Sequence, residues 1–524
     1  MNQNRTPLLL ALLILAVATI VAIIARPMTP IDETRYISVA WEMWLRGDWL
    51  VPYKNGEPYS HKPPLMMWLF QLGWLVFGVS EWWARLVSPL FSAGGLLLTF
   101  ALARRLWPQE AGLGARAVLV LASSLLWIFF STAAMFDVML AFFTLVGMHG
   151  IVRAAEGRRL SGFALLGLAI GLGVLAKGPV ILLHTLPLAV LAPWWQPGLP
   201  WQRWFAGIVG AVLFGAAIAL TWAIPAGIAG GDEYQRAIFW GQTANRMVQS
   251  FAHKRALWWY LPLLPVMFFP WLLIPGVWRG VRDLLCKGLD RGSRFCIAWL
   301  LPVVIAFSLI SGKQMHYLIP VFPAFALLVA RVLRADARGG VWLPAIISLA
   351  LAAALALLAL ERLPLARNPL PELPLLWPAL LLLPLALILG WRVRPTFAGA
   401  ALLGAATVAL LQLSLLRSFH TDYDTKPLAE AIAAAQAEGR QVANDGFYHD
   451  QFHFAGRLRS PLVAFEDEGE MASWLERNPE ARAVVYLKHE RQLQGRKTIA
   501  VHGYLGGVAA LLEAPEAAAL LRGK

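Results

Sequence analysis

The sequence predicts a polytopic α-helical membrane protein that ends in a small α/β domain. Hydrophobic residues make up 58% of the chain and charged residues only 15%, which is more apolar than a single soluble core requires. Long apolar runs recur up to about residue 416 and then stop. The net charge of +14 comes from basic residues that lie between the apolar runs. This distribution disfavours a nucleic-acid-binding protein, which would gather its basic residues on one soluble face.

The first apolar run follows a polar start and has no small-residue cleavage site, so we expect it to remain as a membrane span. Because roughly 20 apolar residues cross a bilayer, the sequence predicts about thirteen spans. They are expected at residues 8–25, 86–103, 116–131, 136–152, 160–175, 179–194, 204–226, 257–278, 295–311, 315–331, 341–360, 375–391 and 397–416. An odd number places the two termini on opposite sides of the membrane.

Basic residues are concentrated in alternate connections between these spans, as the positive-inside rule expects of cytoplasmic loops. Arg104, Arg153 and Arg279 are examples from three of these connections. We therefore expect a cytoplasmic N-terminus, with everything after about residue 417 on the outer side. Cys286 and Cys296 lie in or beside one of the cytoplasmic loops, so no disulfide framework is expected outside the membrane.

The first loop, residues 27–85, begins with a segment that we expect to form a helix at the membrane surface. Thr29 is a candidate N-cap for a helix over residues 30–46, and Gly47 is suited to end it. Its apolar stripe, which includes Trp41, would sink into lipid or pack on the spans.

A second surface helix is expected in the same loop at residues 65–79. The segment is apolar, but it is short and is interrupted by Gln71 and Gly73. If it crossed the membrane, every later basic loop would move to the outer side. Trp68 and Trp74 suit a helix that lies at the depth of the lipid headgroups.

After residue 417 the pattern changes to alternating helix-like and strand-like segments. The helix-like segments are 427–438 and 467–477, and the strand-like segments are 440–444, 461–465, 482–488 and 497–502. The sequence therefore predicts two domains, a transmembrane domain over residues 1–416 and a soluble α/β domain over 417–524.

The predicted topology brings scattered charged residues to the outer face of the membrane, where ionisable groups near the hydrocarbon are functional candidates. In the helix at 30–46, acidic and basic side chains lie one turn apart and can act together. The candidates from the first loop are Asp32, Glu33, Arg35, Tyr36, Tyr59, His61 and Lys62. The candidates from later outer turns are Asp137, Lys177, Lys313, His316 and Tyr317.

These residues also have structural explanations. Asp32 could complement a helix dipole, and Lys62 could extend from an apolar anchor to the interface. Lys177 and Lys313 could be ordinary interfacial lysines, and a lone histidine such as His61 is more often a satisfied polar residue than a ligand. Their shared side of the membrane favours a function, because the charge bias should deplete lysine from short outer turns.

Lysines and an arginine beside a membrane surface suit a lipid-linked phosphate, and a carboxylate in the same cavity can deprotonate an acceptor or support oxocarbenium charge. Together they indicate glycosyl transfer from a polyprenyl phosphate. A nucleotide-sugar enzyme or a metalloprotease is disfavoured, because the sequence has no Gly-rich phosphate loop and no zinc motif. A transporter or flippase of a lipid-linked substrate remains an alternative. It is disfavoured because transporters often contain paired repeats, and this sequence does not show them clearly. A scaffold would leave the loop acids without a role.

With these motifs the chain resembles the membrane glycosyltransferases of the protein O-mannosyltransferase and aminoarabinose transferase superfamily, which have the GT-C fold. The likeness is greatest to the bacterial lipid A aminoarabinose transferases, over the membrane region to about residue 330. The resemblance is carried by Asp32 to Tyr36, Gly47 to Trp49, Tyr59 to Leu65, Asp137, Lys177 to Pro179 and Lys313 to Tyr317.

The resemblance implies a periplasmic-face cavity in the bacterial inner membrane, an undecaprenyl-phosphate-linked sugar as donor, and lipid A or another envelope glycan as acceptor. Asp32 takes the place of the acid near the reacting centre, and Asp137 is the second catalytic candidate. The residues expected to bind the donor phosphate or substrate are Glu33, Arg35, Tyr59, Lys62, Lys177, Lys313 and Tyr317. His61 stands where these enzymes usually have Glu, and this departs from the way those enzymes bind a metal. His61 is nevertheless the one candidate ligand for a divalent metal ion.

Overall fold

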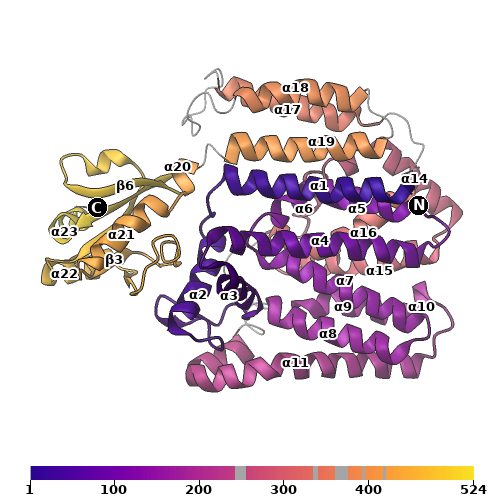
Figure 1. Cartoon of the computed structure of the whole chain (residues 1–524), viewed down its shortest axis with the longest axis horizontal. Helices are drawn as coiled ribbons and strands as arrows, with labels where there is room; N and C mark the ends of the chain where they lie inside the picture. The colour runs from indigo at the N-terminus through magenta and orange to yellow at the C-terminus, as the bar shows by residue number, and fades with distance from the viewer. Residues whose placement is uncertain are drawn as a thin grey trace.

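The computed structural model describes residues 2–241, 255–333, 340–359, 376–391, 396–416 and 420–523. Long helices lie side by side in a bundle, and a smaller unit with a β-sheet adjoins one end of it (Figure 1). The helices of the bundle are α1 (Asn2–Ala25), α4 (Glu81–Leu106), α5 (Leu113–Ser123), α6 (Leu125–Ser131), α7 (Phe136–Ala155), α8 (Arg159–Lys177), α9 (Val180–Val190), α10 (Ala192–Trp195), α11 (Trp201–Arg236), α15 (Arg291–Leu309), α16 (Phe322–Val332), α17 (Trp342–Ala359), α18 (Leu376–Trp391) and α19 (Thr396–Leu411).

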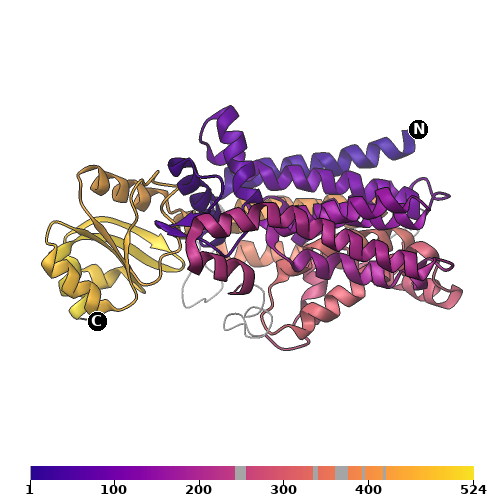
Figure 2. The same ribbon diagram turned by 90° about the horizontal axis from the view of Figure 1, so that it is seen from below.

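Within these residues, eight helices are long and apolar enough to cross a membrane, or nine if the bent pair α5 and α6 counts as one span. Shorter apolar helices such as α9 fall below that length. The expected polytopic helical fold is therefore confirmed, while the number of thirteen spans stays a prediction. The N-terminus and the C-terminal unit lie at opposite ends of the bundle (Figures 1 and 2).

The span expected at 257–278 is wrong as one continuous helix. The structure has only a 3-10 turn at Leu261–Leu263, α13 (Leu264–Met267) and a second turn at Trp271–Leu273, before α14 (Pro275–Lys287). The cause is a series of prolines, each of which removes a backbone donor and disfavours a helix through the residue before it. These prolines are Pro262, Pro265, Pro270 and Pro275.

This broken segment still connects the two ends of the bundle. At its start, the Arg255 backbone N–H donates to the carbonyl oxygen of Ser311, just beyond the end of α15. After it, Gly280 in α14 lies so close to the last turn of α16 that a Cβ there would be 2.1 Å from the Val332 carbonyl oxygen. Glycine at 280 thus permits a close approach at the far end of the bundle.

The first loop contains α2 (Asp32–Arg46), the two-stranded pair β1 (Tyr53–Lys54) and β2 (Glu57–Pro58), and α3 (Leu65–Phe77). Both expected surface segments are therefore helical, and Gly47 ends α2 in the left-handed conformation with φ of 66°.

The expected N-cap of α2 is wrong. Ile31 occupies the cap position without a side-chain hydrogen bond. The Thr29 hydroxyl instead accepts a hydrogen bond of 3.1 Å from Arg26 Nη1, while the Thr29 N–H donates to Glu33 Oε2 at 3.0 Å. At the start of α2, the Glu33 carboxylate therefore accepts a backbone N–H, whereas the Thr29 hydroxyl does not cap the helix.

Trp41 in α2 and Trp74 in α3 contact the C-terminal unit rather than lipid. Trp74 is only 1% exposed, and its ring stacks on Phe454 of the C-terminal unit with centroids 5.4 Å apart. Trp41 Nε1 donates a hydrogen bond of 2.9 Å to the Leu458 carbonyl. The lipid contact expected for Trp74 is therefore corrected, because an apolar stripe does not specify whether lipid or a distant domain covers it.

The C-terminal unit, residues 420–523, contains a five-stranded sheet in the order β4-β3-β5-β7-β6. Strand β3 is parallel to β4 and β5, whereas β7 is antiparallel to β5 and β6. One face is covered by α22 and α23 and the other by α21. The elements are α20 (His420–Tyr423), α21 (Lys426–Ala437), β3 (Val442–Asp445), β4 (Val463–Phe465), α22 (Glu468–Arg477), β5 (Arg482–Leu487), β6 (Thr498–Tyr504), β7 (Gly507–Glu513) and α23 (Ala514–Arg522).

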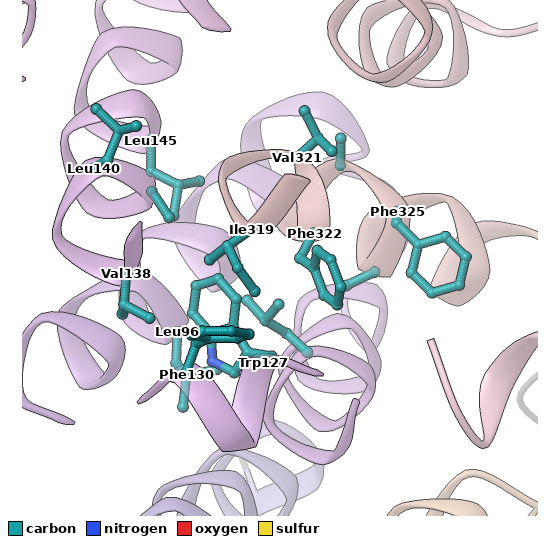
Figure 3. Close-up of a cluster of buried hydrophobic side chains, with 14 of the residues drawn as sticks. Leu96, Trp127, Phe130, Val138, Leu140, Leu145, Ile319, Val321, Phe322 and Phe325 are labelled. Carbon is teal, nitrogen blue, oxygen red and sulfur yellow. The ribbon is translucent and has the colours of Figure 1, made fainter. Parts of the chain in front are cut away.

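Part of the apolar core of the bundle lies where α4, α6, α7 and the segment 315–332 meet (Figure 3). Trp127 is fully buried there, and its Nε1 donates a hydrogen bond of 3.0 Å to Ser92 Oγ. Val138 and Ile319 are buried in the same cluster. Because interiors are densely packed, this core fixes the first turn of α7 and the turn before α16, both of which carry candidate residues.

Candidate active site

The first part of the candidate site is the N-terminal turn of α2. Asp32 forms an ion pair with Arg35, and the Tyr36 hydroxyl donates to Asp32 Oδ1 at 3.1 Å. The Asp32 side chain is 41% exposed and that of Arg35 is 18% exposed, so solvent or a ligand can reach the acid. The three residues thus act together, as their spacing predicts.

Glu33, the next residue, has a different environment. Its carboxylate is buried and pairs with Arg26, and Oε1 also accepts the Ala134 N–H at 2.7 Å. Burial by itself would raise the pKa of Glu33, but the Arg26 guanidinium outweighs this effect and lowers it to about 2. Glu33 therefore holds α2 against the turn before α7, and these contacts give no support to the expected role at a substrate phosphate.

The second part of the site joins the start of α7, the end of α8 and the 3-10 helix Met315–Val321 that precedes α16. Asp137, in the first turn of α7, is 1% exposed and forms an ion pair with Lys177 in the last turn of α8. Lys177 Nζ also lies 5.3 Å from the ring centroid of Tyr317. An acid at a helix N-terminus and a base at a helix C-terminus each complement the helix dipole. The structure therefore brings Asp137, Lys177 and Tyr317 together.

His316 connects the two parts. It is within electrostatic interaction range of Asp137, Lys177, Lys62 and Asp32. Lys62 from the first loop is likewise among the charges that act on Asp137. The first loop, the start of α7 and the end of α8 therefore contribute to one site.

Tyr59 and His61 lie beside this site. Tyr59 is 5% exposed, and it is within electrostatic range of Arg35. The rings of Tyr59 and His61 are 5.2 Å apart. Across the residues that the structure describes, no group of three His, Cys, Asp or Glu side chains could hold a metal ion. The described residues therefore add no support for a metal ion at His61, which stays a prediction.

Lys313 does not join the site. It is 3% exposed, and its Nζ donates to the carbonyl oxygens of Ile310 at 2.5 Å and Arg255 at 3.2 Å. Ile310 is the C-cap of α15, where unpaired backbone acceptors attract a cation, and Arg255 belongs to the segment that contacts this helix end. The contacts of Lys313 are therefore structural, and they do not support the expected substrate binding.

The structure adds one residue to the site that the sequence did not indicate. His449, in the connection between β3 and β4, places Nδ1 at 3.5 Å from Arg35 Nη1. The two residues are 414 positions apart in the chain. A polar run after the strand-like segment 440–444 was the only available signal, and it does not specify the partner of His449.

Comparisons with known proteins find similar membrane transferases. Residues 61–228 match the family model described as dolichyl-phosphate-mannose-protein mannosyltransferase. The chain is 34% identical over 312 residues to an undecaprenyl phosphate-alpha-4-amino-4-deoxy-L-arabinose arabinosyl transferase of Pseudomonas aeruginosa (strain LESB58), covering 58% of this chain and 55% of that protein. It is 32% identical over 310 residues to the protein of the same name from Erwinia tasmaniensis, with 57% and 54% covered. The match thus spans about half the length of these curated relatives.

Solved structures extend the likeness to almost the whole chain. ArnT from Cupriavidus metallidurans in the apo state has a TM-score of 0.77 at 20% identity, covering 97% of this chain and 98% of that one. The same protein bound to undecaprenyl phosphate has a TM-score of 0.74 at 20% identity, with 95% and 97% covered. The resemblance drawn from the sequence motifs is therefore confirmed: this chain is similar to the aminoarabinose transferases and has the GT-C fold of their superfamily.

Proposed function

We propose that the protein is an inner-membrane glycosyltransferase that moves a sugar from an undecaprenyl phosphate donor to lipid A or another envelope glycan. The observation that carries the proposal is the meeting of Asp32, Lys62, Asp137 and Lys177 at one end of an apolar helix bundle. The relatives named above are transferases that use an undecaprenyl-phosphate-linked sugar, and none of them is named as a transporter or flippase.

The cations of the site suit the phosphate of the donor. Arg35 has a planar fork of donors that matches phosphate oxygens, and Lys62 and Lys177 act as point charges. In the reaction, the bond between the anomeric carbon of the sugar and the phosphate oxygen breaks. The departing undecaprenyl phosphate keeps the electron pair, and nearby cations stabilise that negative charge.

Asp32 is the group best placed to accept the proton of the acceptor. As the acceptor oxygen bonds to the anomeric carbon, its proton passes to the Asp32 carboxylate, which is partly exposed and held by Arg35 and Tyr36. Asp137 is buried against Lys177, so we assign it the role of positioning that lysine. Tyr59 and Tyr317 complete the walls beside Arg35 and Lys177.

We also propose that the site end of the bundle faces the periplasm and that the N-terminus is cytoplasmic. Residues 1–416 would then form the transferase domain and 417–524 a periplasmic domain. The basic connections expected in the cytoplasm support this orientation, because α14 and its exposed Cys286 lie at the end of the bundle opposite the C-terminal unit (Figure 1). In spheroplasts, a membrane-impermeant thiol reagent should label Ser473→Cys and leave Cys286 unmodified.

The proposed function is tested by transfer assays in membranes with a labelled undecaprenyl-phosphate sugar. Asp32→Asn and Lys62→Ala should each abolish transfer while the protein remains in the membrane at the wild-type level. Asp283→Asn, an exposed acid on α14 at the opposite end, is the matched control and should keep full activity. Full activity in both site variants would rule out this mechanism.

A further inference from the structure

The connection between β3 and β4, residues 446–462, is anchored on the first loop. Asn55 and Leu462 exchange two hydrogen bonds of 2.8 Å, one in each direction. The Phe454 N–H donates to Ser38 Oγ in α2 at 3.0 Å. The position of this connection relative to the N-terminal turn of α2 is therefore set by direct contacts, so its residues can take part in the site.

His449 is the residue of this connection that contacts the site. Its Nδ1 lies 3.5 Å from Arg35 Nη1, while Arg35 Nη2 pairs with Asp32. Burial, together with the positive charges of Arg35 and Lys54, lowers the pKa of His449 to about 4. The imidazole is consequently neutral at physiological pH, and a neutral ring can accept a hydrogen bond from a guanidinium.

A chain of hydrogen bonds connects His449 to the sheet. Its backbone N–H donates to Gln451 Oε1 at 3.0 Å, and Gln451 Nε2 donates to the Tyr486 hydroxyl at 2.7 Å. The Tyr486 hydroxyl in turn donates to Asn444 Oδ1 in β3 at 2.8 Å. The ring of His449 also contacts Phe447, with centroids 4.7 Å apart. Such supporting contacts are what fix the orientation of a group in a site.

We propose that His449 is a positioning residue of the transferase site, supplied by the C-terminal unit, and that it holds the Arg35 guanidinium in place for the donor phosphate. The inference rests on the proposed function, which places Arg35 at that phosphate. It makes the C-terminal unit a part of the active site, because His449 adds a contact from a second unit to those that Arg35 makes with Asp32 and Tyr36 on its own helix.

The test measures binding of undecaprenyl phosphate to the full chain in lipid nanodiscs. His449→Ala should raise the Kd about tenfold, the size expected when a hydrogen bond to a charged group is lost. His449→Asn, whose Oδ1 can accept at the place of Nδ1, should restore the Kd to within about threefold of wild type. His502→Ala, on β6 of the same unit, is the control and should bind as wild type. Undecaprenol, which lacks the phosphate, should bind all variants alike.

A double-mutant cycle separates positioning of Arg35 from a general effect on the fold. In an Arg35→Ala background, His449→Ala should have no further effect on the Kd. An equal loss in both backgrounds would overturn the inference, as would wild-type binding by His449→Ala. If His449→Ala lowers the thermal midpoint, His449→Phe replaces it, because it keeps a ring but has no acceptor. Failure of the wild-type chain to bind undecaprenyl phosphate would overturn the proposed function itself.

Discussion

The two ends of the helix bundle both carry charged clusters, but the clusters are built differently. At the end away from the C-terminal unit, Arg331 pairs with Asp290 at 2.7 Å and with Glu110 at 3.2 Å. Asp290 also caps α15 by accepting the Ser293 N–H at 2.7 Å, and it accepts a hydrogen bond of 3.0 Å from Trp107 Nε1. Each charge in this cluster faces an opposite charge or a helix end, as in a structural clamp.

Among the proposed substrate-facing side chains that the structure describes, the positive charges exceed the negative charges. Arg35, Lys62 and Lys177 contribute three cations, whereas Asp32 and Asp137 contribute two carboxylates, all within one electrostatic neighbourhood. An anionic ligand such as a phosphate would complete the balance. In this protein, the cluster with more cations than carboxylates suits an anionic ligand. The cluster in which each charge has an opposite partner suits a structural role.

The largest expected effect on transfer activity comes from substitution of Lys177 in the site cluster. Lys177→Met removes a cation from the site and leaves the Asp137 charge buried, so transfer should fall by about 10²- to 10³-fold, as for loss of one charge-stabilising group. Adding Asp137→Leu removes the orphaned charge, so the double variant should recover thermal stability but not transfer. Recovery of transfer in the double variant would show that the pair is only structural.

The buried pair of Arg26 and Glu33 gives the next largest effect. Glu33→Gln leaves the Arg26 charge without its partner in a buried position, so unfolding should become easier by about 3–5 kcal/mol. Glu110→Gln, in the partly exposed cluster at the opposite end, is the matched substitution and should cost about 1 kcal/mol or less. Thermal unfolding of both variants in nanodiscs measures the difference. Similar midpoints would mean that Glu33 is not the buried support that its contacts indicate.

Sequence reasoning found the local features of the site and missed those that depend on distant contacts. The helix at 30–46, its end at Gly47 and the meeting of Asp32 with Arg35 follow from spacing alone. The shared location of Asp137 and Lys177 follows from topology. The structural environments of Glu33 and Lys313 could not be predicted, because their partners are the guanidinium of Arg26, just after α1, and the carbonyls of Ile310 and Arg255.

Two further misses have the same physical cause. The cover over Trp74 and the contact of His449 with Arg35 both join the first loop to a unit more than 350 residues later in the chain, and no periodicity encodes such a pairing. At 257–278, by contrast, the prolines were visible in the sequence. The high hydropathy of that segment predicts a span, but its prolines remove the backbone donors that a continuous helix needs.

A smaller, pH-dependent difference is expected where the C-terminal unit docks on the first loop. Burial, together with the nearby Glu42 carboxylate, raises the pKa of Asp450 to about 8. Because the folded-state pKa lies above the unfolded value of about 3.9, this contribution to stability is fully present below about pH 4 and is lost as the pH rises to about 8. The titration of Asp450 should therefore lower the thermal midpoint of the wild-type chain as the pH rises across this range.

Asp450→Asn isolates that component from other ionisable groups at the interface, which include Glu42, Lys54, His449 and His453. Asparagine imitates the protonated acid, so the variant should lose less stability than wild type between pH 7 and pH 8. The measured quantity is the difference between the two thermal midpoints at each pH. A constant difference would show that Asp450 does not titrate in this range.

The smallest effect is expected from Arg331 at the opposite end. Its side chain is 31% exposed, and partly solvated ion pairs contribute little, so Arg331→Ala should lower the free energy of unfolding by about 1 kcal/mol or less. Asp290 keeps its hydrogen bonds from Ser293 and Trp107 in this variant, so the start of α15 remains capped. Transfer activity should be unchanged, because no residue of this cluster reaches the site. A loss of transfer greater than the loss of folded protein would mean that the two ends of the bundle are coupled, and the contrast between a structural cluster and a binding cluster would then fail.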